Sequence, residues 1–585
     1  MALTGAADPG NAEGFEEPGA QSPRAPRVPR ARLGWAVLVA VAGGLALAAA
    51  FPPAGIWPLA VAGPALLVVA LWHRSLRASF IIGLAFGIAF FVPLLSWLVN
   101  VAWYAWIALA VTEALILGLL AVGQQVLLRL RAWPLGVAGW WVAAEALRGR
   151  WPYAFPWGRL AMSQAGAPTA GWAAVGGAPL LTFLIALAGA ALAWLLIGPA
   201  RGEPARGEPA RSEPARGEPA RSEPARSEPA RGEPAGDGGQ PAGPDGSRVP
   251  GLARRRALPL LAAAGTAGLA VAGVVLPVDR PAAAPQATIA AVQGDVPRAR
   301  TLANQLRATK VTANHAAATE ALAAQVRAGA RPAPDLVIWP ENSTDLDPLL
   351  NPPVYATIAQ AVSAIGKPVL VGSVLQNPLR NAGQLWLPRG GPAGVYAKRQ
   401  LVPFGEYIPF RSLLDKFTSL PSLQPVNFTP GHKAVVFHVG KIRLGDVICY
   451  EVGFDNLVSS EVRAGANLLA VQSNDADFEL DGQTGESAQQ LAMARIRAVE
   501  SDRAVVYVST TGESAIIAPD GTVMTRSGIW RRAVLEARVP LRSQLTLADR
   551  AGSWPETAIT ALTLAALAWA AARAFGQARR AKPPR

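Results

Sequence analysis

The sequence has few residues that can bind a metal or form a disulfide. It holds one cysteine and four histidines in 585 residues. A single cysteine excludes an internal disulfide and a cysteine-based zinc site, and the histidines show no ligand spacing. No glycine-rich phosphate loop lies between an expected strand and an expected helix. We therefore predict no metal and no cofactor.

Charged residues are also scarce. They make up 16% of the chain, against 51% hydrophobic residues and 18 tryptophans, whereas soluble domains carry about 25% charged residues. Part of the chain is therefore expected to lie in lipid. The net charge of +14 comes mainly from the two tails and from short segments between apolar runs. This placement favours membrane orientation over a phosphate-binding face, so we predict no nucleic-acid partner.

Eight apolar stretches approach the ~20 residues that span a bilayer as a helix. The fifth is the weakest, because it is short and carries Glu145. No cleavable signal pattern precedes the first, so it is expected to remain as an anchor. The predicted membrane helices are 33–51, 55–72, 79–99, 103–128, 134–148 and 178–198, which form a membrane domain over 33–198, then 257–277 and 556–575.

The loop charges predict the orientation of these helices. Basic residues recur in every second connection, which by the positive-inside rule is the cytoplasmic one. The predicted cytoplasmic segments are the disordered tail 1–32, the loops with Arg74, Arg77, Arg129 and Arg131, the linker 199–256 and the basic tail 576–585. The large segment 278–555 then falls on the extracytoplasmic side.

A repeat dominates the linker. Residues 201–235 are seven copies of Arg-(Gly/Ser)-Glu-Pro-Ala. A proline every five residues prevents a continuous helix, and each copy has no net charge and no apolar surface to bury. We predict a disordered cytoplasmic spacer without a catalytic role.

Segment 278–555 alternates expected strands and helices, which predicts an α/β layered domain. Its apolar β-branched runs are typical of buried strands covered by helices. The predicted strands are 286–293, 335–339, 368–375, 393–398, 434–439, 442–449, 467–473 and 504–510, and the predicted helices include 303–328, 353–365, 455–464 and 484–502.

Three polar residues follow expected strands in this domain. Glu341 lies in Trp-Pro-Glu-Asn, Lys398 lies in Tyr-Ala-Lys, and Cys449 lies in Ile-Cys-Tyr-Glu. Each is ambiguous alone. A solitary cysteine in an apolar strand is more often a small packing residue than a nucleophile, and a glutamate or lysine near a turn is usually solvated.

Together the three resemble the Glu-Lys-Cys set of the nitrilase superfamily, in the same order and with separations of 57 and 51 residues. A narrower resemblance is to the apolipoprotein N-acyltransferase family, in which a nitrilase domain lies between the seventh and eighth of eight membrane helices. The segments that carry it are 398–409, 448–451, 472–475 and 493–500. The implied fold is a multi-pass α-helical membrane domain of about eight helices plus an extracytoplasmic α/β nitrilase-like αββα sandwich.

The resemblance implies a two-step acyl transfer in a bacterial cytoplasmic membrane. The nucleophile Cys449 would take the sn-1 acyl chain of a membrane phospholipid as a thioester. The amine of an S-diacylglyceryl-cysteine at a lipoprotein N-terminus would then receive it. Glu341 is implied as general base and Lys398 as the group that stabilises the thiolate and the oxyanion. We expect a monomer whose partners are these two substrates and membrane lipid.

Supporting roles are also implied. The backbone N–H of Tyr450 is expected to be a second oxyanion donor, while Glu406 and Glu451 are expected to position Lys398 and the incoming amine. Three segments depart from the family pattern. These are 298–302, 476–479 and 482–490, the last of which lacks the usual Gly-Pro and Gln-His pairs.

Other functions stay open at this point. The departures fit a divergent paralogue with an altered acyl acceptor. A membrane-tethered amidase would use the same triad to hydrolyse a small amide, and a scaffold would only bind partners.

The membrane half carries candidates of its own. Phe155, Trp157, Ser163 and Gln164 resemble a family segment that faces the active site. The alternative is an aromatic belt at the membrane interface, to which Trp151, Tyr153 and Trp157 would belong. The helix carboxylates Glu113 and Glu145 are either structurally paired or functional.

Overall fold

The structure is a computed structural model, and it describes both the membrane half and the α/β half. The described residues are 30–197, 264–265, 268, 272–273, 284–297, 304–416, 424–479 and 485–580. Most of the predicted tail 1–32, the linker 199–256 and most of the predicted helix 257–277 lie outside the described residues. Those expectations stay predictions.

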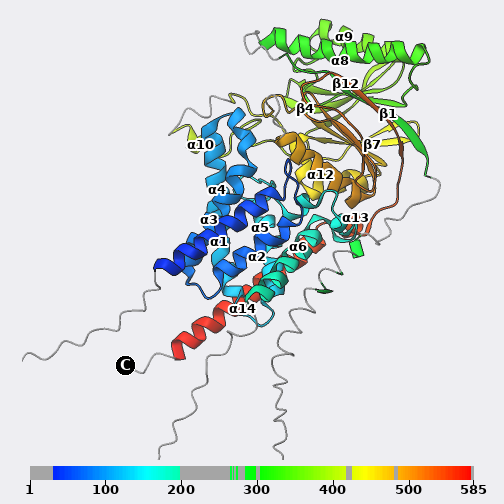
Figure 1. The fold of residues 1–585 in the computed structure, drawn as a ribbon. Helices are drawn as coiled ribbons and strands as arrows, with labels where there is room; N and C mark the ends of the chain where they lie inside the picture. The colour runs from blue at the N-terminus through cyan, green and yellow to red at the C-terminus, as the bar shows by residue number, and fades with distance from the viewer. Residues whose placement is uncertain are drawn as a thin grey trace, which may run out of the picture.

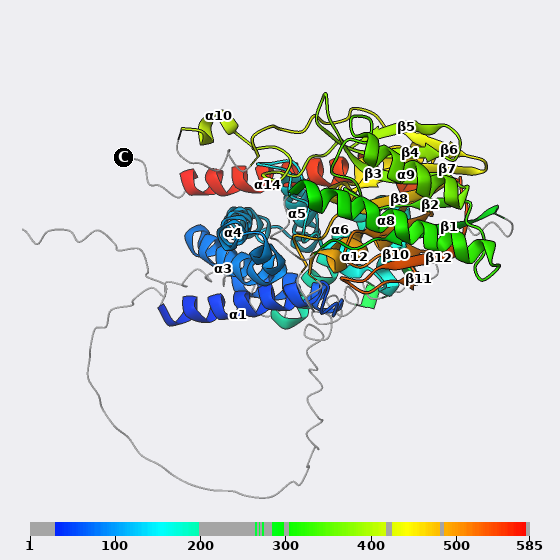
Figure 2. The same cartoon turned by 90° about the horizontal axis from the view of Figure 1, so that it is seen from above.

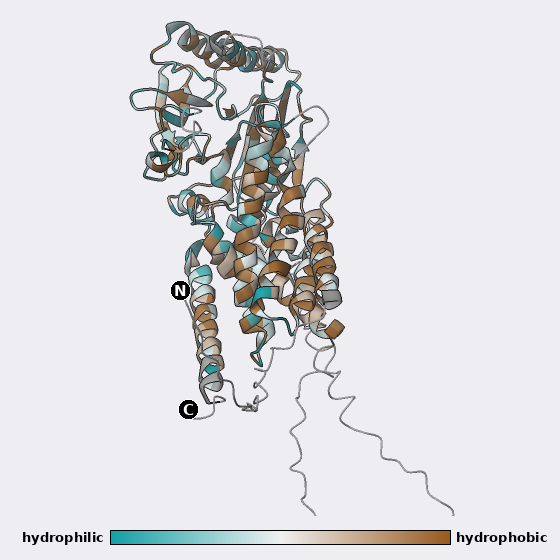
Figure 3. Ribbon diagram, turned by 90° about the vertical axis from the view of Figure 1, so that its left-hand side faces the viewer, coloured by the Kyte–Doolittle hydropathy of each residue, from teal (hydrophilic) through white to brown (hydrophobic). Residues whose placement is uncertain are grey.

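Among the described residues, seven helices build the membrane half. Four are long and apolar enough to cross a bilayer, namely α3, α4, the stretch 168–197 that contains α6, and α14 over 554–574, while α1 and α2 are shorter apolar helices. Figure 3 shows hydrophobic residues along these helices. The helices are α1 (Arg30–Ala49), α2 (Leu59–Leu71), α3 (Leu76–Leu94), α4 (Trp103–Leu127), α5 (Trp133–Arg148), α6 (Ala173–Ile197) and α14 (Trp554–Arg580), with 3-10 turns η1 (Ser96–Asn100), η2 (Leu160–Gln164) and η3 (Pro168–Trp172).

Small residues allow the membrane helices to pack closely. A Cβ added to Gly83 of α3 would lie 2.3 Å from the Cβ of Ala121 in α4. Helices in lipid associate largely through such close contacts, because lipid supplies no hydrophobic driving force between them. In α6 the backbone is not helical at Gly176 and Gly177, where φ is +70° at Gly177. The uninterrupted part of the helix therefore begins after Gly177, close to the start at 178 that the apolar run predicted.

The α/β half is a sandwich of two six-stranded sheets, as the nitrilase resemblance implied (Figure 1). One sheet has the order β12-β1-β2-β3-β4-β5 and the other has the order β11-β10-β9-β8-β7-β6. The strands are β1 (Gln286–Gln293), β2 (Leu336–Ile338), β3 (Val369–Leu375), β4 (Arg380–Leu387), β5 (Gly391–Ala397), β6 (Val436–Val439), β7 (Ile442–Ile448), β8 (Leu468–Ser473), β9 (Ala504–Ser509), β10 (Ala515–Ile517), β11 (Val523–Arg526) and β12 (Ala533–Pro540).

Helices cover the outer face of each sheet. Viewed from above in Figure 2, α8 and α9 lie over the strands, and α12 lies on the side of the membrane helices. Trp339, Ile358 and Trp386 form part of the core beneath α8 and α9. The helices are α8 (Asn304–Arg327), α9 (Pro352–Ile365), α10 (Arg411–Leu414), α11 (Asp455–Arg463), α12 (Glu486–Ser501) and α13 (Leu547–Ala551), with the 3-10 turn η6 (Cys449–Gly453).

All eight predicted strands are found, with bounds shifted by a few residues. Four further strands, β4, β10, β11 and β12, were not predicted. The sequence of β4 is Arg-Asn-Ala-Gly-Gln-Leu-Trp-Leu, and asparagine, glycine and alanine are depleted in strands. Pairing decides its conformation, because β4 lies between β3 and β5 and is antiparallel to both.

The membrane half and the sandwich share a packed interface. Asn100 donates to the carbonyl of Phe478 at 2.7 Å, and Gln489 of α12 donates to the carbonyl of Leu94 at 2.9 Å. Arg159 binds both carboxylate oxygens of Asp455 at 2.7 and 3.0 Å. This pair lowers the pKa of Asp455 well below its usual range despite burial. The sandwich is therefore fixed to one end of the helices.

Candidate active site

The predicted triad comes together at the ends of three strands. Glu341 follows β2, Lys398 follows β5 and Cys449 follows β7, and all three side chains are buried. Nζ of Lys398 lies 2.9 Å from Oε1 of Glu341. Burial and the charge of Glu341 raise the pKa of the Cys449 thiol well above its usual value, and Lys398 opposes them. The resting thiol is therefore protonated, with a carboxylate and an ammonium group facing it.

Two carboxylates and an amide hold Lys398. Nζ also donates to Oε1 of Glu406 at 3.1 Å. Asn381 donates to Glu341 at 2.6 Å and to Glu406 at 2.7 Å. Burial would lower the pKa of Lys398, but Glu341 and Glu406 outweigh it and raise the pKa above its usual value. Lys398 therefore stays charged, while burial raises the pKa of Glu341 against the opposing charge of Lys398.

The backbone at Cys449 has an unusual conformation. The residue begins the 3-10 turn η6 directly after β7, and its φ is +52°. A residue other than glycine in the left-handed region costs roughly 1–2 kcal/mol. Such strain persists only where the surrounding structure holds it, and it is frequent at functional sites. Because of this conformation, β7 ends at Ile448 and Cys449 lies just beyond the end of the strand.

Glu451 connects this turn to the segment around Lys398 through hydrogen bonds. One carboxylate oxygen accepts from the N–H of Ile448 and the hydroxyl of Tyr396, both at 2.8 Å. The other accepts from the backbone N–H groups of Arg399 at 2.7 Å and Gln400 at 3.1 Å. Glu451 is fully buried. The groups that Glu451 binds lie on either side of Lys398 in the chain, which suits a role of Glu451 in positioning the lysine. Both carboxylate oxygens of Glu451 are occupied by these hydrogen bonds.

The membrane half contacts the turn that holds Cys449 through an aromatic stack. The ring of Trp157 is stacked on Tyr450 at 5.5 Å and on Phe155 at 5.7 Å. The Tyr450 hydroxyl donates to the carbonyl of Ala154 at 2.6 Å. Trp157 is buried, unlike Trp151, which is 57% exposed. Of the two alternatives for this loop, contact with the turn that holds Cys449 is found for Trp157, and Phe155 packs against the other side of the stack.

The other membrane-half candidates have structural partners. Ser163 and Gln164 hydrogen-bond to each other, and Gln164 accepts from Thr169. Glu113 forms a buried ion pair with Arg148 at 2.5 Å. Glu145 accepts from the N–H of Leu160 and the hydroxyl of Thr182, both at 2.8 Å. These contacts fit structural pairing for Glu113 and Glu145.

Three residues near the triad were missed by the sequence analysis. Asn381 comes from the unpredicted strand β4. Ser473 and Gln490 lie 3.7 and 3.4 Å from Sγ of Cys449. Gln490 belongs to the segment 482–490, where the chain departs from the family pattern. That departure, which fitted an altered acyl acceptor, was the signal available for Gln490, whereas Ser473 lies in segment 472–475, which carries the family resemblance.

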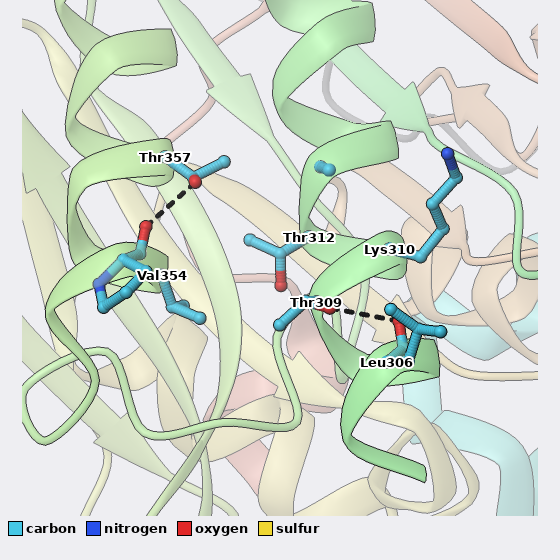
Figure 4. Close-up of a pocket in the computed structure, with 8 residues that line it drawn as sticks. Leu306, Thr309, Lys310, Thr312, Val354 and Thr357 are labelled. Atoms are coloured by element: carbon cyan, nitrogen blue, oxygen red, sulfur yellow. Dashed lines mark hydrogen bonds between the residues drawn. The ribbon is translucent and has the colours of Figure 1, made fainter. Parts of the chain in front are cut away.

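Two of the cavities in the described structure are lined in part by residues of α8. The first, of 270 Å³, lies between α8 and α9 and is lined by residues such as Leu306, Thr312 and Val354 (Figure 4). None of its lining residues belongs to the triad. The second, of 490 Å³, is lined by Asn342 and Asn474, which follow β2 and β8, and by Arg307 of α8. This cavity adjoins the strand ends that carry the site.

Sequence comparisons cover both halves of the chain. The apolipoprotein N-acyltransferase N-terminal domain matches residues 43–191, and the carbon-nitrogen hydrolase domain matches residues 288–544. An apolipoprotein N-acyltransferase from Mycolicibacterium smegmatis is 36% identical over 88% of this chain and 81% of its own length. This chain belongs to the apolipoprotein N-acyltransferase family.

Further relatives agree with this assignment and confirm the resemblance. Apolipoprotein N-acyltransferases from Azotobacter vinelandii and Pseudomonas putida are each 28% identical, over 94% and 91% of this chain and 98% and 96% of their own lengths. Among solved structures, an amidase from Nesterenkonia sp. is 19% identical, covers 46% of this chain and 95% of its own, and has a TM-score of 0.33. The protein is thus a membrane protein of the apolipoprotein N-acyltransferase family with a carbon-nitrogen hydrolase domain.

Proposed function

We propose that this protein transfers an acyl chain from a membrane phospholipid to the N-terminal amine of S-diacylglyceryl-cysteine in lipoproteins, through a thioester on Cys449. The observation that carries the proposal is the buried Lys398, held at 2.9 Å by Glu341 and at 3.1 Å by Glu406 beside the only cysteine. Family membership supplies the substrate classes.

In the first step, Glu341 takes the thiol proton as general base, and the thiolate attacks the carbonyl carbon of the sn-1 ester. The new S–C bond leaves a negative oxygen, which Lys398 and the N–H of Tyr450 stabilise. When the intermediate collapses, the C–O bond breaks and the leaving oxygen takes the proton from Glu341. The products are acyl-Cys449 and a lysophospholipid.

In the second step, the lipoprotein amine attacks the thioester carbonyl and forms a C–N bond. Glu341 accepts a proton from the attacking nitrogen, the C–S bond breaks, and the proton returns to the sulfur. The same oxyanion donors serve both steps. The raised pKa of Glu341 suits a group that must hold and release a proton near neutral pH.

We further propose that the catalytic half lies on the extracytoplasmic side of the bacterial cytoplasmic membrane. The contacts from Leu94 and Asn100 to the sandwich involve the end of α3 and the turn after it. The basic residues Arg74 and Arg77 lie at the start of the same helix. Because basic loops stay in the cytoplasm, the sandwich end faces outward.

The test uses purified protein in detergent, a phospholipid labelled in its sn-1 chain and a diacylglyceryl lipopeptide. We expect mass spectrometry to find an acyl thioester on Cys449 and then an acylated peptide amine. Cys449→Ala is the control and should give neither product. Labelled enzyme that yields only free fatty acid would favour an amidase-like hydrolase. Equal behaviour of wild type and Cys449→Ala would refute the proposal.

A further inference from the structure

A closed ring of polar contacts begins and ends at Sγ of Cys449, separate from the Lys398 cluster. Gln490 donates from Nε2 to Sγ at 3.4 Å and to Oε1 of Glu486. Glu486 faces Asp475 as a carboxyl pair. Asp475 accepts from the hydroxyl of Ser473 at 2.6 Å, and that oxygen lies 3.7 Å from Sγ. The four residues that complete the ring with Cys449 are at most 2% exposed.

The ring fixes which way each group points. The Ser473 hydroxyl has one hydrogen, and the shorter contact assigns it to Asp475 rather than to the sulfur. The Gln490 amide has two hydrogens, of which one meets Glu486 and the other points to the sulfur. A flipped amide would place its oxygen against the Glu486 carboxylate oxygen.

The carboxyl pair keeps the amide in place. A negative charge on Glu486 is disfavoured because the residue is buried and faces the Asp475 carboxyl group. Burial, together with Asp475 and Glu479, raises the pKa of Glu486 well above its usual value. Tyr507 donates to the second Asp475 oxygen at 3.2 Å. The Gln490 amide is therefore held with its N–H group pointing to the sulfur.

We propose that Gln490 is a further catalytic residue, whose amide N–H stabilises the Cys449 thiolate both as attacking nucleophile and as leaving group. Glu486 is its positioning residue. This hydrogen bond offsets the neighbouring negative charge, because it is stronger to the thiolate than to the thiol. The inference rests on the proposed role of Cys449 as nucleophile.

The thiol can be tested directly, because alkylation by iodoacetamide reports on the single cysteine. The groups that face it are Glu341, Lys398, Glu486, Asp475 and Tyr507. We expect Gln490→Met, which keeps the size but loses the donor, to move the midpoint of the alkylation rate against pH upward by about 0.5–1 unit. This corresponds to about 3- to 10-fold less thiolate near neutral pH, the change expected when one hydrogen bond that favours the thiolate over the thiol is removed.

The matched control is Gln489→Met, the preceding buried glutamine of α12, which bonds to the Leu94 carbonyl and not to sulfur. It should destabilise the protein without moving the midpoint. If Gln490→Met fails to fold, Gln490→Asn is the second variant. Its side chain is shorter by one methylene, which moves the N–H donor away from the sulfur, and it should shift the alkylation midpoint in the same direction.

A Gln490→Met profile that superimposes on wild type would overturn the inference, as would an equal shift in Gln489→Met. Alkylation needs no lipid substrate. A shifted midpoint in a protein that transfers no acyl chain would therefore refute the proposed function and leave the role of Gln490 standing.

Discussion

Replacing Lys398 by methionine tests the energetics of the site most directly. The substitution leaves Glu341 and Glu406 buried without their shared cation, and both are at most 8% exposed. Removing one partner of a buried ion pair costs about 3–5 kcal/mol, because the remaining charge is uncompensated. At ~2–4 °C per kcal/mol for a domain of this size, we expect the melting temperature to fall by roughly 10 °C.

The double variant Lys398→Met with Glu406→Gln separates charge from packing. The second substitution removes one of the two carboxylates that lost their cation. We therefore expect the fall in melting temperature to be about half of that in Lys398→Met. Acylation should stay at least ~10³-fold below wild type in both variants, since the oxyanion donor is absent from each. Tryptophan fluorescence follows the melting, and thioester formation on Cys449 is followed by mass spectrometry.

The reasoning would be refuted by either of two results. Additive losses in the double variant would show that Lys398 and Glu406 do not interact energetically, because contacting residues should couple. Acylation by Lys398→Met within tenfold of wild type would show that the lysine is not the main oxyanion donor.

Three further predictions concern the nucleophile turn and the domain interface. In thermal unfolding, the free energy of unfolding of Cys449→Gly should exceed that of Cys449→Ala by about 1 kcal/mol, because only glycine tolerates a φ of +52° without strain. Equal stability of the two variants would argue against backbone strain at this position. Trp157→Ala should cost about 3–5 kcal/mol and slow acylation, measured on the same samples, because it removes the stack on Tyr450. The pKa of Asp455 is depressed in the folded state, so its stabilisation is present above an unfolded pKa of about 4 and is lost as pH falls below it. In acid titrations followed by fluorescence, Asp455→Asn should therefore lose stability at pH 7 and show a smaller acid-induced loss than wild type.

Residues adjacent in sequence played separate roles in the site. The pattern Ile-Cys-Tyr-Glu predicted a nucleophile, an oxyanion donor and a supporting carboxylate. The structure adds that the Glu451 carboxylate binds backbone groups around Lys398 and that the Tyr450 ring packs against the membrane half. One turn thus links the lysine segment, the nucleophile and the membrane helices, and no single local pattern contains that information.

Local composition predicts the membrane helices that the structure describes, the α/β half and the order of Glu341, Lys398 and Cys449. Lipid requires long apolar helices and buried strands require apolar runs, so both are visible in the sequence. No local pattern indicates that Asn381 joins the two carboxylates or that Gln490 contacts the sulfur. Strand β4 forms because its neighbours pair with it, and hydrogen bonds between residues far apart in the chain depend on how the sheets and helices pack.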